Sequence, residues 1–418
     1  MLPEWFYSLP VVILSLALLG IYGFHRTFSH PAAVLTGLYL LSSVGAMFVN
    51  PDTMPGFNFA HSWQMLAGYS ILIGLSIFPA IFIQRGPPPN LSEHPSFRLV
   101  LLLLCALAWF SLIYQIPFAI ISFKTGADTI RHQLNTEEFS PLPQNLLTTL
   151  ATAVSQFYPI YSLAAVEGYI RKRSLVYISS CIAGSLCVVV NSICFTARDG
   201  VLWFLMSFWL ALWIYRNEMP KTYSGMVKSL AVLSIACGIG LLSIFTYQRF
   251  AGSSVGIFDS LVTYIGQQPY VFAETVAEQS AFYGLNLRLP LIAEMLGSFE
   301  PIKRERVYEW TFGTFAKDFY SIAGWPTAFA ITATFSLFFT FVFCSRRKLN
   351  SFSYSLLLIL FFQFMTQGVF YFRLGIRAGN YYIIIVLMLA AVVQLLYGSA
   401  TNPIPSRQKL SAKSRTNY

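Results

Sequence analysis

Charge is scarce in this sequence. Only 11% of its 418 residues are Asp, Glu, Lys or Arg, whereas 56% are hydrophobic, and the mean hydropathy is +0.61. About a quarter of a soluble globular protein is normally charged, so this composition excludes a soluble globule. We expect an all-α, polytopic integral membrane protein, because helices satisfy their own backbone polar groups within lipid.

Motifs of metal- and nucleotide-dependent enzymes are also missing. The chain has no G-x-x-x-x-G-K phosphate loop, no H-E-x-x-H and no two aspartates separated by one residue. An ATPase, a zinc protease and a metal-dependent nucleotide-sugar transferase are therefore disfavoured, and no cofactor or metal is predicted. The six cysteines fall in or at the ends of apolar segments without CxxC or Cys/His spacing, which favours packing roles.

Apolar segments recur that are long enough to cross the hydrocarbon core, which takes roughly 20 helical residues. We expect about eleven membrane-spanning helices, within a range of ten to twelve. They run near residues 6–24, 32–48, 60–83, 98–121, 146–169, 174–195, 200–215, 226–247, 323–344, 353–372 and 381–398. The first segment has no Lys or Arg before it and ends in Phe-His-Arg rather than in small residues, so a cleaved signal peptide is not expected.

Basic residues divide unevenly between the two sides of these spans. With the C-terminus inside, sixteen of the 27 Lys and Arg residues and only three acidic residues fall on one side. Basic residues in short loops are retained in the cytoplasm, so this side is expected to be cytoplasmic. The chain then divides into an N-terminal bundle (1–247), a large periplasmic loop (248–322), C-terminal helices (323–400) and a basic cytoplasmic tail (401–418).

The periplasmic loop is far longer than an ordinary connection between helices. Its length favours a functional element with short helices of its own over a plain linker. Residues 258–265 and 290–299 mix apolar and polar side chains, which suits helices lying at the membrane interface.

Arginines on the outward side are the sharpest chemical signal, because the positive-inside bias opposes them. Arg198 lies in a short turn and Arg249 directly follows an apolar segment; Arg373 and Arg377 flank a tight turn and would share one face if that turn is helical. Guanidinium groups bind phosphate oxygens bidentately, so the set suits a pyrophosphate. The alternative is that each arginine snorkels to lipid headgroups or pairs with a loop carboxylate.

Carboxylates in the long loop are candidates for a general base. Glu274 and Glu278 are four residues apart and would share a helix face, Glu294 lies in an apolar run that predicts burial, and Asp318 precedes the next span. A base near an attacking sugar hydroxyl would assist glycosyl transfer, and Glu294 and Glu274 rank first for that role. The alternative for each is a solvated or salt-bridged loop acid.

Short sequence patches resemble those of the Wzy-type O-antigen polymerases of Gram-negative bacteria, which polymerise oligosaccharide repeat units. The patches are the Arg-Asp-Gly at 198–200, TYIGQQPY at 263–270, TFGTF at 311–315 leading through Asp318 to the Ala-Gly-Trp at 323–325, and the late outward arginines. The resemblance covers most of the chain and rests on architecture together with these patches.

The resemblance implies a fold related to the GT-C class of membrane glycosyltransferases and a reaction at the periplasmic face of the bacterial inner membrane. A glycan leaves one undecaprenyl pyrophosphate and is joined to the repeat unit on another, without metal or nucleotide. Implied partners are these lipid-linked oligosaccharides, membrane lipids, a chain-length regulator and other polysaccharide-assembly membrane proteins, and no nucleic acid.

The resemblance also assigns residues. The implied pyrophosphate- and glycan-binding residues are Arg198, Arg249, Arg288, Arg373, Arg377 and Tyr270, with Arg288 a weaker match. The implied catalytic residues are Arg198, Arg249 and Arg377, joined by Glu294 and Glu274 as candidate bases. The arginines would stabilise the charge that develops on the leaving pyrophosphate.

Three other functions stay open. An O-antigen ligase resembles this architecture but uses a histidine late in its large loop, and this chain has no histidine after His132. A flippase for lipid-linked oligosaccharides would carry polar residues along mid-helix positions, whereas charge here gathers in loops and at helix ends. A purely structural assembly subunit is the third.

Overall fold

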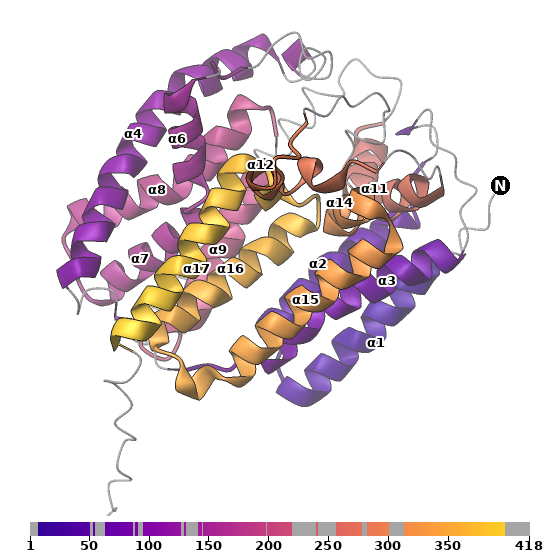
Figure 1. Ribbon diagram of the computed structural model, residues 1–418, viewed down its shortest axis with the longest axis horizontal. Helices are drawn as coiled ribbons and strands as arrows, with labels where there is room; N and C mark the ends of the chain where they lie inside the picture. Colours follow the sequence, from indigo (N-terminus) through magenta and orange to yellow (C-terminus); the bar gives the residue numbers. More distant parts are fainter. Residues whose placement is uncertain are drawn as a thin grey trace, which may run out of the picture.

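The computed structural model describes residues 7–50, 53–54, 63–86, 88–90, 95–126, 129–130, 141–143, 145–197, 199–219, 240, 256–277, 282–300 and 313–397. Over these residues the chain is all-helical, with no strand (Figure 1). The prediction of an α-helical architecture is confirmed.

The first half of the chain forms helices that pair closely in sequence order. They are α1 (Ser8–His25), α2 (Pro31–Ala46), α3 (Trp63–Ile77) continued by the 3₁₀ helix η3 (Phe78–Phe82), α4 (Pro95–Thr125), α6 (Leu146–Ser155), α7 (Tyr158–Ile170), α8 (Leu175–Cys194) and α9 (Asp199–Tyr215). Helix α8 packs against α4, α7 and α9, while α1 packs against α2 and α3.

The second half mixes long helices with short ones. They are α11 (Ile257–Ala277), η4 (Gly284–Leu287), α12 (Pro290–Met295), α14 (Thr314–Ala323), α15 (Trp325–Cys344), η5 (Arg346–Lys348), α16 (Ser351–Gly368), η6 (Arg373–Gly375) and α17 (Arg377–Tyr397). In Figure 1, α9, α16 and α17 lie between a group formed by α4, α6, α7 and α8 and a group formed by α1, α2, α3 and α15.

Six of the described helices are long and apolar enough to cross a membrane. They are α1, α3 with η3, the 99–125 part of α4, α8, α15 and α17; α2, α6 and α9 are shorter apolar helices. Ten of the eleven expected spans coincide with described helices, and the one near 226–247 lies outside the described residues except for Gly240. The expectation of eleven spans is thus met only in its coarser form, an all-helical protein with several potential membrane spans.

The expected span at 146–169 is wrong in one respect, because it is two helices. Helix α6 ends at Ser155 and α7 begins at Tyr158, with Gln156 and Phe157 in a turn between them. Pro159 occupies the first turn of α7, where its missing N–H costs no helical hydrogen bond. The proline therefore favours a new helix start over a continued helix.

The expected short helices of the long loop also differ from those observed. The segment predicted at 258–265 belongs to the 21-residue α11, which continues through Pro269, and the segment predicted at 290–299 contains only the six-residue α12. Residues 266–276 of α11 are almost all buried, and the helix packs along α2, whereas most of residues 258–265 are half-buried or exposed. The predicted segment is therefore the less buried part of a longer helix.

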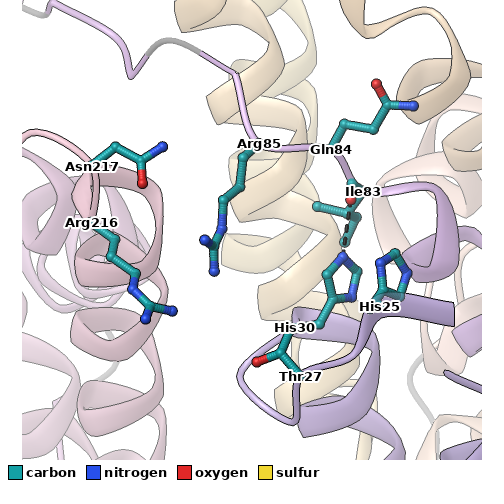
Figure 2. Close-up of a pocket in the computed structure, with 8 residues that line it drawn as sticks. All are labelled: His25, Thr27, His30, Ile83, Gln84, Arg85, Arg216 and Asn217. Atoms are coloured by element: carbon teal, nitrogen blue, oxygen red, sulfur yellow. Dashed lines mark hydrogen bonds between the residues drawn. The ribbon is translucent and has the colours of Figure 1, made fainter. Parts of the chain in front are cut away.

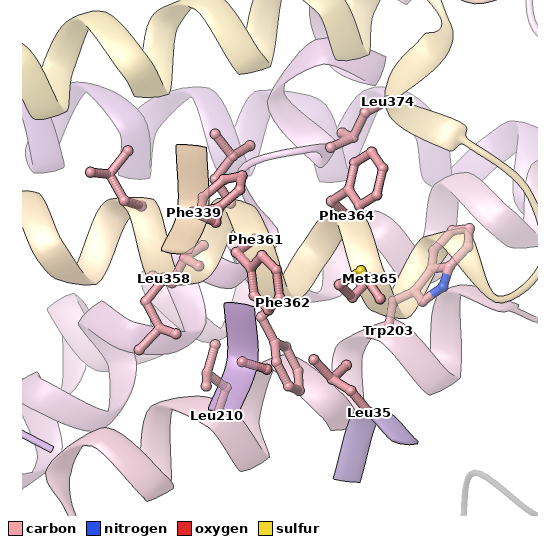
Figure 3. Close-up of a cluster of buried hydrophobic side chains, with 14 of the residues drawn as sticks. Leu35, Trp203, Leu210, Phe339, Leu358, Phe361, Phe362, Phe364, Met365 and Leu374 are labelled. Atoms are coloured by element: carbon pink, nitrogen blue, oxygen red, sulfur yellow. The ribbon is translucent and has the colours of Figure 1, made fainter. Parts of the chain in front are cut away.

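Helix α16 forms the centre of the core. Every residue from Ser353 to Gly368 is buried. Figure 3 shows Phe361 and Phe364 of this helix among aromatic and aliphatic side chains of its neighbours. Phe361 lies 5.1 Å from Phe339 of α15, and Phe364 stacks on Phe335 at 4.1 Å, ring centroid to ring centroid. Such aromatic pairs add to the energy of apolar burial and hold α15 against α16.

The seam between α2 and α11 uses small residues and polar contacts. A Cβ atom on Gly266 would lie 2.2 Å from the backbone carbon of Gly45, so only glycine permits this approach. The Ser42 hydroxyl donates to Gln268 Oε1 at 2.9 Å across the same seam. Helices within lipid associate through close packing of small residues and through interhelical hydrogen bonds. The hydrophobic effect does not drive them together there, because lipid tails are as apolar as the side chains.

The outer faces of several helices are apolar and exposed. Leu19 of α1, Phe341 of α15 and Leu395 of α17 are 63%, 72% and 82% exposed. A soluble protein rarely presents apolar surface on this scale, whereas lipid covers it without cost. The exposed faces support a membrane-embedded protein.

The long helices end at two opposite ends of the bundle (Figure 1). One end, called the basic end below, carries Arg26, Arg85, Arg171, Lys172, Arg173, Arg216, Arg346, Arg347 and Lys348, which follow α1, η3, α7, α9 and α15. The opposite end, called the paired end below, carries α12, α14 and η6 and the first residues of α9 and α17. Helices α9, α15, α16 and α17 each run from one end to the other.

Candidate functional site

Arg373 at the paired end is buried and held by two helices. Its Nη2 donates to Asn191 Oδ1 at 2.7 Å, and its Nη1 lies 3.9 Å from Asp199 Oδ1. The guanidinium also lies over the Trp203 ring, 4.5 Å from the centroid, which adds a cation–π attraction. These partners belong to α8 and α9, so Arg373 fastens the η6 turn to them.

Arg288 and Asp318 form a buried ion pair that reaches the same turn. Arg288 Nη2 lies 2.6 Å from Asp318 Oδ1, and the two side chains are 8% and 1% exposed. The other carboxylate oxygen of Asp318 accepts from the backbone N–H of Phe372 at 2.6 Å. One carboxylate therefore joins α14, the residue that follows η4 and the turn that precedes η6.

Asn380 and Gly375 complete this connection. The Asn380 amide donates to the carbonyl oxygen of Leu374 at 2.8 Å and to that of Arg288 at 3.3 Å. A Cβ atom on Gly375 would lie 2.7 Å from Cδ of Arg288, so the turn packs directly on the arginine stem. Arg288 therefore packs on the same turn that Arg373 holds against α8 and α9.

Arg377 differs from both because it is exposed. Its Nη2 pairs with Glu294 Oε1 of α12, and the two side chains are 54% and 31% exposed. The predicted burial of Glu294 is met only in part, because its side chain is half-buried. Helix α12 buries Pro290, Leu291 and Ala293, and Glu294 extends from the same face at the end of the helix to reach Arg377. An exposed ion pair is worth little net stability, so either partner can exchange for a ligand at small cost.

The expectation that Arg373 and Arg377 share a helix face is also wrong. Residues 373–375 form a 3₁₀ turn, Ile376 is extended (φ −81°, ψ 161°), and α17 begins only at Arg377. The extended residue separates the two side chains, so one contacts α8 and α9 and the other contacts α12.

Tyr270 and Glu274 belong to α11 and not to the turn, and Tyr270 contacts α2. The Tyr270 ring stacks on Tyr7 at 4.0 Å, and its hydroxyl donates to the carbonyl oxygen of Ala46 at 2.8 Å. Glu274 is 2% exposed. Burial, then Tyr270, then Glu274 raise the pKa of the Tyr7 phenol far above its usual value. These contacts give Tyr270 a role in joining α11 to α2.

Several predicted residues lie outside the described part of the chain. They are Arg198, Arg249 and Glu278. Asp199, which follows Arg198, is described and contacts Arg373. The assignments of Arg198 and Arg249 stay predictions.

Three contributors to the paired end were missed at the level of sequence: Asn191, Trp203 and Asn380. Asn191 follows three valines in α8, and a polar side chain in such an apolar run was an available signal. Asn380 lies three residues after Arg377, close to it on α17, which was a weaker signal. Trp203 looks like any other aromatic residue of an apolar helix.

The described residues contain no group of three or more His, Cys, Asp or Glu side chains placed to hold a metal ion. A cavity of about 630 Å³ lies at the basic end, away from the arginines of the paired end.

The chain was compared with models of protein families, with curated proteins and with solved structures. None of the three comparisons gives a match.

Proposed function

We propose that this protein is a membrane glycosyltransferase that joins undecaprenyl-pyrophosphate-linked oligosaccharide repeat units into O-antigen or a related surface polysaccharide. The observation that carries the proposal is the exposed Arg377–Glu294 pair beside a turn braced by the buried Arg288 and Arg373. It offers a guanidinium and a carboxylate together on a rigid support, at the end of a membrane-embedded bundle.

The orientation follows from charge. The basic end would face the cytoplasm, because loops rich in Lys and Arg are retained there, and the paired end would face the periplasm. The lipid-linked substrates would then approach the paired end with their pyrophosphates at the membrane interface.

Arg377 is the proposed ligand of the leaving pyrophosphate. A guanidinium binds two phosphate oxygens at once, and it stabilises the charge that grows on the pyrophosphate as the glycosidic bond breaks. An incoming pyrophosphate competes with Glu294 for Arg377. The exchange costs little because the pair is exposed.

Glu294 is the proposed base. Once Arg377 engages the pyrophosphate, the Glu294 carboxylate is released to accept the proton of the attacking sugar hydroxyl. The bond from the anomeric carbon to the pyrophosphate oxygen breaks, a bond from that carbon to the acceptor oxygen forms, and undecaprenyl pyrophosphate leaves. Holding both substrates at one site supplies much of the remaining acceleration.

Arg288 and Arg373 act differently in this proposal. Both are buried and engaged by Asp318, Asn191 and Asp199, so they position the turn that presents Arg377 rather than bind phosphate themselves. Their loss should remove activity by displacing Arg377 and by destabilising the fold.

The test is the size profile of surface polysaccharide in cells that lack this protein. Lipid A core bearing a single repeat unit is the expected result, because flipping and ligation continue while polymerisation stops. Bare core with repeats on the periplasmic face would instead indicate a ligase, and bare core with repeats on the cytoplasmic face a flippase.

A further inference from the structure

A cavity of about 630 Å³ opens at the basic end of the bundle. Its walls come from three places: the α1–α2 connection with Thr27 and the two histidines His25 and His30, the segment after η3 with Arg85, and the end of α9 with Arg216. Figure 2 shows both guanidinium groups directed into the space between α9 and the two histidines. The function proposed above does not use this cavity.

The lining is cationic and carries no carboxylate. Neither Arg85 nor Arg216 makes an ion pair within the described part of the chain. Arg85 lies over the Trp213 ring, 5.0 Å from its centroid, and Arg216 donates to the Ser29 hydroxyl at 3.4 Å. Burial and the neighbouring charge of Arg216 lower the pKa of Arg85, as expected of cations held together without an anion.

The two histidines give the cavity a fixed wall. Their rings stack at 3.6 Å, and their Nε2 atoms donate to the carbonyl oxygens of Ile81 and Ile83, each at 3.0 Å. His30 Nδ1 accepts from the backbone N–H of Ala32 at 3.3 Å, so His30 is neutral with its proton on Nε2. Burial holds the pKa of His30 at about 4, which keeps it neutral at physiological pH.

We propose that this cavity binds a phosphate group, with the Arg85 and Arg216 guanidinium groups as its ligands. Two converging guanidiniums provide bidentate donors for phosphate oxygens, and an anion between them would relieve their repulsion. Thr27 and Asn217 line the same space and offer further polar contacts. Basic pockets between membrane helices bind anionic lipid headgroups in this way, and a soluble phosphate offers the same chemistry.

The test uses the full-length protein, purified in detergent and depleted of lipid, with short-chain phosphatidylglycerol and inorganic phosphate as the two probes. Native mass spectrometry counts bound lipid, and thermal unfolding reports each probe. The variants are Arg85→Gln and Arg216→Gln. The matched control is Arg347→Gln, which removes the same charge from an exposed residue of the basic end that does not line the cavity.

The expected result is saturable binding of one phosphatidylglycerol, weakened roughly tenfold or more by either cavity substitution and unchanged by Arg347→Gln. Binding of inorganic phosphate that shows the same dependence on the two arginines, with no gain from lipid, would support the site and assign it to a soluble phosphate. Equal weakening by Arg347→Gln, or no binding of either probe to the unsubstituted protein, would overturn the proposal. Arg216 is exposed, so Arg216→Gln carries the test if Arg85→Gln does not fold.

Discussion

The arginines of the paired end and the two that line the cavity at the basic end lie in opposite environments. At the paired end, Arg288, Arg373 and Arg377 each contact a carboxylate, and two of the three are buried. At the basic end, Arg85 and Arg216 face a cavity with no acidic lining. The number of arginines at one end therefore does not predict anion binding. A buried, paired arginine stabilises the fold, whereas an exposed or unpaired arginine can still bind an anion.

The largest effect is expected from removal of the buried carboxylate of the paired end. Asp318→Ala should lower the free energy of unfolding by roughly 3–5 kcal/mol, because Arg288 is left buried and uncompensated. Thermal unfolding and abundance in the membrane measure the loss. Replacing both partners by apolar residues, as in Arg288→Met with Asp318→Leu, should restore most of the stability; a double variant as unstable as the single one would contradict this account.

The free energy of unfolding should depend on pH because of His30 at the basic end. Burial lowers the pKa of His30 to about 4, below the unfolded value of about 6.5. The unfolded chain then binds more protons between these values, so stability is fully present above pH 6.5 and falls as the pH drops toward 4, by up to roughly 3 kcal/mol. The free energy of unfolding, measured across this pH range in the unsubstituted protein and in His30→Asn, tests this prediction. The same dependence on pH in both proteins would contradict the assignment to His30.

The stability of the fold should depend on the planar shape of the Arg373 guanidinium as well as on its charge. Arg373→Lys keeps the charge near Asp199 but loses the planar group that lies over Trp203 and reaches Asn191, so we expect about 1–2 kcal/mol of destabilisation. Thermal unfolding is the measurement. Arg377→Lys is the matched control, since Arg377 is exposed and its pair with Glu294 contributes little to stability.

Arg377 should matter least for stability. Arg377→Ala removes an exposed pair, which contributes less than about 1 kcal/mol, so unfolding and abundance should stay close to those of the unsubstituted protein. A large loss of stability would place Arg377 with the buried arginines and remove the distinction drawn between them.

Helices could be predicted from the sequence because apolar run length is local information. Ten of the eleven expected spans coincide with described helices. The break between α6 and α7 was missed because residues 146–169 are apolar on both sides of Pro159. The length of α11 was missed because its burial comes from α2, more than two hundred residues earlier in the chain.

The partners of the arginines could not be predicted. Arg373 contacts Asn191 and Asp199, and Arg288 contacts Asp318. These partners are distant in the sequence, and the spacing of residues along the chain does not show that the fold brings them together. The sequence assigned Arg288, Arg373 and Arg377 to one side of the bundle but treated the arginines as equivalent. Burial separates them, and only packing decides burial.

The most direct test of the role proposed for Arg377 is polysaccharide chain growth in cells that lack the unsubstituted protein and produce the Arg377→Ala variant. The account predicts lipid A core bearing a single repeat unit at normal protein abundance, and impaired growth with Arg377→Lys, which keeps the charge but loses the bidentate fork. Full-length polysaccharide from Arg377→Ala would contradict the account.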